Sequence, residues 1–244
     1  MKLQKNKILF IVFILVIIIL SIVLFITKKL IRNKSIEKHF YITYKKMQKL
    51  FKQFNIEYVA SGGTLIGAAR DSKFIPWDSD MDFCTDIKNK DKIISNEFKQ
   101  EAVKMNLDVR YWENAPFWGG IGGLKISEGG SWDIGQIDMF FISNAVDENI
   151  YYLGNDGHKH LWSEHCYMKE NLFPIRFLNF EFPTISKSVQ IPCPNKYSKE
   201  LKRHFGEKYM EPPSDKQIVY KIDKINLLII YFFILFMFIL FLRV

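Results

Sequence analysis

Two apolar runs near the ends of this 244-residue chain restrict its architecture more than any other feature. The first covers residues 8–27 and carries no charged side chain. The second covers residues 225–242, where Asn226 is the only strongly polar side chain. An α-helix rises about 1.5 Å per residue, so about 20 residues cross a hydrocarbon core of about 30 Å. Both runs are therefore predicted to be transmembrane helices.

Two other interpretations of the apolar runs are weaker. Buried core helices of this length normally have a polar face, which both runs lack. A cleaved signal peptide is disfavoured for the first run, because the run is too long and has no small-residue cleavage site. The predicted division is therefore a basic tail at 1–7, a transmembrane helix at 8–27, a juxtamembrane helix at 28–49, a soluble domain at 50–213, a linker at 214–224 and a transmembrane helix at 225–242.

The basic residues beside the runs bear on the orientation of the soluble domain. Three precede the first run and five follow it, up to Lys38, whereas three precede the second run and only Arg243 follows it. Cytoplasmic flanks of membrane spans are enriched in Lys and Arg, so both comparisons lean toward a cytosolic domain. The differences are small. The prediction is a two-pass membrane protein in a lipid bilayer, with the side of the soluble domain left open.

The composition of the chain excludes several classes of protein. Four of its 34 basic residues lie in the terminal segments, which leaves 30 against 26 acidic residues and no clustered basic surface for nucleic acid. Its three cysteines have no C-x-x-C spacing, so neither a disulfide scaffold nor a zinc site is indicated. With 16% aromatic residues, the chain can bury a core and is not disordered.

The segment between the runs has alternating helix and strand patterns, which predicts an α/β fold with a mixed sheet. A β-hairpin is predicted within residues 172–182, with its turn at Leu178 and Asn179. From their hydrophobic periodicity, helices are predicted at 35–55, 64–69, 89–105 and 195–205, and strands at 56–60, 81–84, 107–112 and 136–142.

Three aspartates alternate along the chain at positions 78, 80 and 82. Residues two apart in a strand point to the same face, so Asp80 and Asp82 are expected to present two carboxylates together. Such a pair is repulsive unless a proton or a cation bridges it, and hard oxygen ligands favour Mg²⁺ or Mn²⁺. The alternative is a solvated edge or turn, with or without structural Ca²⁺.

A glycine turn precedes the aspartates and a further acidic strand follows them. Gly62 and Gly63 end a predicted strand and open a helix, where backbone N–H groups can approach an anion. Asp138 lies in an apolar strand, which is costly unless the side chain is paired or metal-bound. The alternative for Asp138 is an ion pair with a buried Arg or Lys. Together these features predict a phosphoryl-transfer site, in which Asp138 binds metal or accepts the proton of an attacking hydroxyl.

The stretch from Gly62 to Phe83, GGTLIGAARDSKFIPWDSDMDF, resembles the signature of the LicD family, which includes bacterial phosphocholine transferases, fukutin and fukutin-related protein. The IDMF segment at 137–140 resembles the next acidic strand of the family, and residues 172–213 resemble its C-terminal block. The resemblance covers about residues 50–213. It implies a nucleotidyltransferase-like fold with metal-binding aspartates on the central sheet.

The resemblance also implies an activity. Family members move a phosphorylated alcohol, such as phosphocholine or ribitol phosphate, from a CDP-linked donor to a hydroxyl of a glycan or glycoconjugate, with release of CMP. The metal and catalytic roles carry over to Asp80, Asp82 and Asp138, with Mg²⁺ or Mn²⁺ as the ion. Donor binding carries over to Gly62, Gly63, Thr64 and Arg70. The alternative for Arg70 is a salt bridge to Asp78 or Asp80, and Lys125 is expected to be solvated, with a phosphate contact as the alternative.

The region 143–170 matches the family poorly. Because its spacing fits no standard zinc pattern, a donor- or acceptor-specific loop is predicted there, with a metal site as the alternative. The residues concerned are His158, His160, Glu164, His165 and Cys166. Two other functions also stay open: an NTP-using nucleotidyltransferase, and a non-catalytic membrane-bound module in glycan assembly.

Overall fold

The computed structural model describes residues 19–21, 23, 33–75, 78–112, 122–132, 134–153 and 167–212. Residues 19–21 and 23 are helical, and the rest of the predicted span 8–27 lies outside the described residues. The tail at 1–7, the linker at 214–224 and the predicted span 225–242 lie outside them too. Among the residues that the structure describes, no helix has both the length and the apolar character needed to cross a bilayer.

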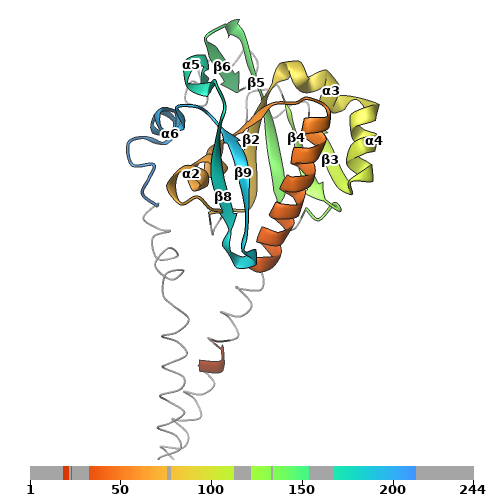
Figure 1. The fold of residues 1–244 in the computed structure, drawn as a ribbon, viewed down its shortest axis with the longest axis vertical. Coiled ribbons are helices and arrows are strands. Elements are labelled where there is room, and N and C mark those ends of the chain that lie inside the picture. The colour runs from red at the N-terminus through yellow and green to blue at the C-terminus, as the bar shows by residue number, and fades with distance from the viewer. Residues whose placement is uncertain are drawn as a thin grey trace, which may run out of the picture.

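A mixed sheet of seven strands forms the centre of the domain (Figure 1). Five strands follow the order β1–β2–β5–β4–β3, in which β2 and β5 are parallel and the other neighbours are antiparallel. The mixed α/β sheet predicted from the sequence is therefore confirmed. The strands are β1 (Tyr58–Ala60), β2 (Asp80–Asp86), β3 (Leu107–Trp112), β4 (Gly123–Glu128), β5 (Gln136–Asp147), β6 (Ile150–Leu153) and β7 (Tyr167–Met168), where β6 pairs with β5 and with β7.

Short helices connect the strands of the sheet. α2 (Gly62–Arg70) follows β1, and η1 (Ile87–Asn89), α3 (Lys90–Ile94) and α4 (Asn96–Lys104) lead from β2 to β3. The single helix predicted at 89–105 is wrong, because Ser95 interrupts it. Its backbone is extended and its hydroxyl accepts the N–H of Phe98 at 3.1 Å, so Ser95 caps a new helix. α5 (Lys169–Leu172) follows β7 directly, and α6 (Tyr197–Phe205) follows the β-hairpin at residues 176–193.

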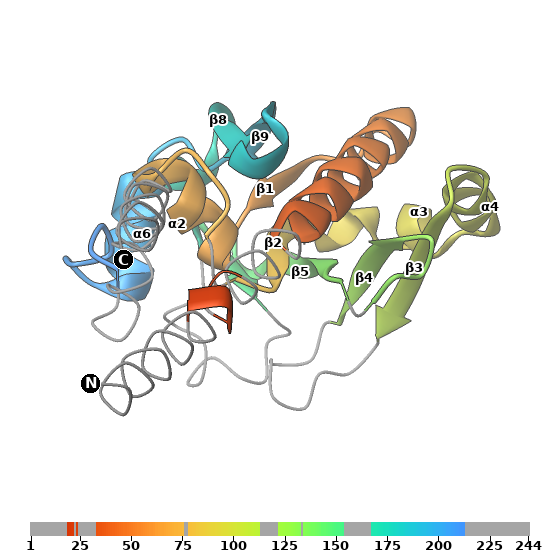
Figure 2. The ribbon, with the colours of Figure 1, turned by 90° about the horizontal axis from the view of Figure 1, so that it is seen from below.

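The helix at 33–53 belongs to the core of the domain. Phe40, Tyr44, Met47 and Phe51 recur at helical spacing and are fully buried. Figure 2 shows this helix on the same face of the sheet as the hairpin of β8 (Arg176–Phe182) and β9 (Lys187–Cys193). Tyr44 Oη donates to the carbonyl of Gln190, on β9, at 3.0 Å. The predicted boundary between a juxtamembrane helix at 28–49 and the domain at 50–213 therefore falls inside a continuous core helix, and the domain includes this helix.

The hairpin also differs from its prediction. β8 (Arg176–Phe182) pairs with β9 (Lys187–Cys193), and Leu178 and Asn179 lie inside β8, opposite Ile191 and Gln190. The predicted turn at these two residues is wrong, because Phe180 and Phe182 keep the two-residue alternation of a strand and are fully buried. The turn lies instead in η4 (Pro183–Ile185), where proline lacks the N–H that a ladder needs.

Met47→Ala is expected to lower the free energy of unfolding by about 2–5 kcal/mol, because the side chain is fully buried and its loss leaves a cavity in the core. Urea unfolding followed by circular dichroism measures this change. Lys45→Ala, on the exposed side of the same helix, is the matched control and should change stability little. Equal effects of the two substitutions would contradict the assignment of this helix to the core.

Candidate active site

The parallel pairing of β2 and β5 brings three carboxylates together. Asp82 lies directly beside Asp138 in the register of the two strands. Asp80 precedes Asp82 by two residues, while Met81 and Phe83 between and after them are fully buried. One carboxylate oxygen from each of Asp80, Asp82 and Asp138 lies within 4.8 Å of the others. The three acidic residues singled out in the sequence therefore form one cluster, which can hold a divalent cation.

The first turn of α2 stands against this cluster. Gly62 has a φ of +48°, which L side chains rarely adopt. A Cβ at Gly62 would lie 2.6 Å from Oδ2 of Asp82, and a Cβ at Gly63 would collide with the carboxylate of Asp78. Thr64 Oγ1 accepts the N–H of Asp82 at 2.9 Å, which ties the helix to β2. The glycines are therefore required by the close approach of the helix to the carboxylates.

Burial and crowding disfavour negative charge in this cluster. Burial is the largest cause that raises the pKa of Asp82 to about 8, and repulsion from Asp80, Asp78 and Asp138 adds to it. The N–H of Gly63 opposes this rise by donating to Asp82. Burial, followed by the charge of Asp80, raises the pKa of Asp78 to about 7. A cation among these groups would offset the repulsion.

The two oxygens of Asp138 differ in their surroundings. Oδ2 accepts from Lys125 Nζ at 3.2 Å and from Gln136 Nε2 at 3.4 Å. Oδ1 is buried and has no hydrogen-bond partner among the described residues. Burial raises the pKa of Asp138, while Lys125 opposes the rise. The ion pair that the sequence analysis gave as the alternative for Asp138 is present, with Lys125. It uses only Oδ2. A buried Oδ1 without a hydrogen bond is energetically costly, and a bound cation would remove this cost.

Lys125 lies in the same row of the sheet as the acidic residues. It pairs with Asp138 across β4 and β5, and Asp138 pairs with Asp82 across β5 and β2. The side chain of Lys125 is 38% exposed, so its ammonium group can reach a ligand as well as Asp138. Sequence reasoning expected a solvated lysine here. It missed the pairing because the register of β4 against β5 cannot be read from a local pattern.

Asp78 joins the site although it was not among the predicted ligands. Its carboxylate packs against Gly63 and hydrogen-bonds with Asp80. The alternation of aspartates at 78, 80 and 82 contained this signal, because an extended chain keeps residues two apart on one side.

Arg70 occupies the other end of α2 from the glycine turn. It lies eight residues beyond Gly62, which is about 12 Å along the helix axis. Its side chain is 6% exposed and its Nε donates to Asp71 at 2.8 Å. The predicted contact of Arg70 with donor phosphate stays a prediction. The histidine-containing segment, with His158, His160, Glu164, His165 and Cys166, lies outside the described residues.

The family model described as "LicD/FKTN/FKRP, nucleotidyltransferase domain" matches residues 55–196, more than half of the chain. The matched region contains the glycine turn and all four aspartates of the site. The chain belongs to the LicD family. The resemblance predicted from the sequence is therefore confirmed, and the protein is a transferase of nucleotidyltransferase-like type.

The chain is also similar to the solved structure of the lincosamide antibiotic adenylyltransferase LnuA with lincomycin bound. The two are 16% identical over 68% of this chain and 92% of that chain, with a TM-score of 0.38. At this TM-score the likeness carries no conclusion about function. Comparison with curated proteins gives no match.

Asp82→Asn is expected to raise the melting temperature of the metal-free protein at pH 8. The pKa of Asp82 rises on folding from 3.8 to about 8, so the folded state binds this proton more tightly than the unfolded chain. Stability therefore falls as pH rises through this window, and asparagine removes the penalty while keeping the shape. Scanning calorimetry with a chelator should show a larger gain at pH 8 than at pH 5, at about 2–4 °C per kcal/mol.

Glu148→Gln is the matched control for this measurement, since it removes the same charge from an exposed turn. It should change the melting temperature little at either pH. A loss of stability in Asp82→Asn that is equal at pH 5 and pH 8 would contradict the crowding of charge at this site.

Proposed function

We propose that this LicD-family protein is a metal-dependent phosphotransferase in glycan modification. In this proposal it moves a phosphorylated alcohol, of the phosphocholine or ribitol phosphate type, from a CDP-linked donor to a hydroxyl of a glycan or glycoconjugate. The observation that carries the proposal is the cluster of Asp80, Asp82 and Asp138 within 4.8 Å, beside the glycine turn of α2. Membership of the LicD family supports transferase activity. The identities of the donor, the acceptor and the metal are part of the proposal.

The residues present fit a hard divalent cation. Three carboxylates supply hard oxygen ligands, and the buried Oδ1 of Asp138 has no hydrogen-bond partner among the described residues. Asp80, Asp82 and Asp138 would hold Mg²⁺ or Mn²⁺, because such hard cations prefer oxygen ligands. When bound, the ion supplies charge neutralisation and Lewis acidity to the phosphate groups.

The remaining groups of the site bind and orient the substrates. The N–H groups at Gly62, Gly63 and Thr64 lie at the N-terminus of α2, where the helix dipole favours a donor diphosphate. Lys125 donates to a phosphate oxygen of the donor from the neighbouring strand. Asp138 accepts the proton of the attacking hydroxyl, in addition to its place among the ligands.

We also propose that the protein is anchored in a membrane by residues 8–27 and 225–242. Their uncharged composition supports this anchoring. The domain would then act on acceptors that lie close to a bilayer, with the side of the membrane left open.

Asp80→Asn and Asp82→Asn are each expected to lower kcat by about 100-fold or more, because each removes a carboxylate that would hold the cation, and the cation would offset the negative charge of the transferring phosphate. The assay incubates the purified full-length protein with CDP-choline or CDP-ribitol, a glycan acceptor and Mg²⁺ or Mn²⁺, and measures the release of CMP. Asp108→Asn is the matched control, since its carboxylate lies on β3 and contacts Arg110 and Trp132.

Three outcomes would overturn the proposal, from this assay together with a parallel assay of pyrophosphate release from NTPs and a metal-binding titration. Release of CMP that is unchanged in both variants would remove the assigned role of the carboxylates. Release of pyrophosphate from an NTP, without turnover of a CDP-linked donor, would favour a nucleotidyltransferase. Absence of both turnover and metal binding would favour a non-catalytic module.

Lys125→Met is expected to act in opposite directions on two ligands. It removes the cation that pairs with Asp138 at 3.2 Å, so Mn²⁺ measured by titration calorimetry should bind more tightly. It also removes a charged donor to phosphate, so the KM for the CDP-linked donor should rise about 10-fold or more. Lys99→Met, at an exposed position of α4, is the control. Weaker binding of both Mn²⁺ and the CDP-linked donor in Lys125→Met would contradict the assigned role of Lys125.

A further inference from the structure

Ser61 occupies the N-cap position of α2 but does not cap the helix. Its φ of −133° and ψ of 178° are extended, as a capping residue requires. A serine in this position normally accepts the N–H of the second or third helical residue, here Gly63 or Thr64. The Ser61 hydroxyl instead lies 2.6 Å from the phenolic oxygen of Tyr167 on β7.

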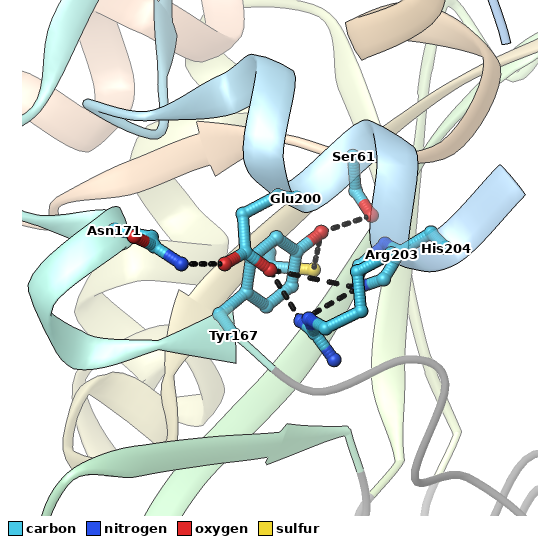
Figure 3. Close-up of polar contacts among 7 residues, drawn as sticks. Ser61, Tyr167, Asn171, Glu200, Arg203 and His204 are labelled. Carbon is cyan, nitrogen blue, oxygen red and sulfur yellow. Dashed lines mark hydrogen bonds and ion pairs between the residues drawn. The ribbon is translucent and has the colours of Figure 1, made fainter. Parts of the chain in front are cut away.

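Both the backbone and the side chain of Ser61 are held in place. Its N–H donates to the carbonyl of Asp82 at 2.9 Å, which fixes the start of α2 beside β2. The Tyr167 hydroxyl that holds the side chain also accepts from Cys84 Sγ at 3.9 Å. Tyr167 itself is only 1% exposed, so this hydroxyl has a fixed position inside the protein. Figure 3 shows the Tyr167 hydroxyl directed toward Ser61.

Helix α6 fixes the ring of Tyr167. The ring of His204 packs edge-on against it, with ring centroids 5.2 Å apart. Glu200, which is fully buried, forms an ion pair with Arg203, and Nε2 of His204 lies 3.7 Å from the same carboxylate oxygen. Asn171 Nδ2 donates to the other oxygen of Glu200 at 2.7 Å (Figure 3). The ring of Tyr167 therefore packs against His204, and His204 belongs to a buried polar group with Glu200, Arg203 and Asn171.

The direction of the Ser61 hydroxyl matters because two acceptors would compete for the same donors. The first N–H groups of a helix have no partner within the helix. A capping hydroxyl and a phosphate oxygen both bind there. Because the N–H of Gly63 donates to Asp82, the competition concerns the N–H of Thr64. If the Ser61 hydroxyl turned toward Thr64, a phosphate would have to displace it.

We propose that Tyr167 is a positioning residue that holds the Ser61 hydroxyl away from the N-terminus of α2. The N–H of Thr64, the third residue of the helix, then stays available to the diphosphate of the donor, while the N–H of Gly63 donates to Asp82. This inference rests on the proposed function, because it requires a diphosphate at that turn. Neither Tyr167 nor Ser61 takes part in bond formation. They determine whether the N–H of Thr64 donates to the serine hydroxyl or to a phosphate oxygen.

The test measures the affinity of CDP, which carries the diphosphate whatever the head group of the donor. Tyr167→Phe keeps the ring and removes the hydroxyl that lies 2.6 Å from the Ser61 hydroxyl, which leaves Cys84 as the other side-chain partner of Ser61. Titration calorimetry of the full-length protein with Mn²⁺ present should show about five-fold weaker CDP binding, the effect of a typical N-cap hydrogen bond on an equilibrium. The KM for a CDP-linked donor should rise by the same factor, with kcat nearly unchanged.

The decisive variant combines Tyr167→Phe with Ser61→Ala. Removal of the competing hydroxyl should restore the CDP affinity of the unsubstituted protein, although the double variant has lost more contacts. A merely structural role of Tyr167 predicts the reverse, with binding at least as weak as in Tyr167→Phe. Ser61→Ala alone should bind CDP as the unsubstituted protein does, and this variant tests the inference even if Tyr167→Phe fails to fold.

Four results would overturn the inference. Unchanged CDP binding in Tyr167→Phe, or no restoration in the double variant, would refute the positioning role and leave the proposed function intact. Weaker CDP binding in Ser61→Ala would show that the serine hydroxyl contacts the ligand itself. Absence of CDP binding by the unsubstituted protein with Mn²⁺ would refute the proposed function and this inference together.

Discussion

Repulsion between carboxylates that the sheet forces together governs the rest of this structure. The parallel register of β2 and β5 places Asp82 beside Asp138, and the pleat adds Asp80 on the same face. Burial raises the pKa of Asp82 to about 8, so the ionised cluster is unfavourable without a compensating cation. A stable fold gains nothing from such an arrangement. In a LicD-family transferase the cluster fits the proposed chemistry on phosphate groups, whose negative charge the same cation would offset.

The start of α2 is built around this cluster. A side chain at Gly62 or Gly63 would collide with Asp82 or Asp78, so the helix can approach only because both positions lack a Cβ. The same approach places the N-terminal amides of α2 beside the carboxylates. Under the proposed function, a diphosphate would meet N-terminal amides of α2 on one side and the carboxylates, with the cation that they would hold, on the other. The contact of Ser61 with Tyr167, and of the Tyr167 ring with His204, connects the start of α2 to α6.

The carboxylate cluster could be predicted from sequence because its signal is local. Alternation of Asp80 and Asp82 in a strand, and an acidic residue inside the apolar strand around Asp138, each indicate a costly charge on a sheet. The partners of these residues depend on long-range pairing. The contact of Lys125 with Asp138 requires the register of β4 against β5, and that of Tyr167 with Ser61 spans 106 residues. No periodicity within either segment contains that information.

The most direct test of this account is a crystal structure of the full-length protein grown with Mn²⁺ and CDP, with anomalous scattering used to locate the metal. The account predicts one manganese peak bounded by Asp80, Asp82 and Asp138, and the diphosphate of CDP at the N-terminus of α2. A manganese peak elsewhere in the domain, or a diphosphate bound away from the N-terminus of α2, would contradict it.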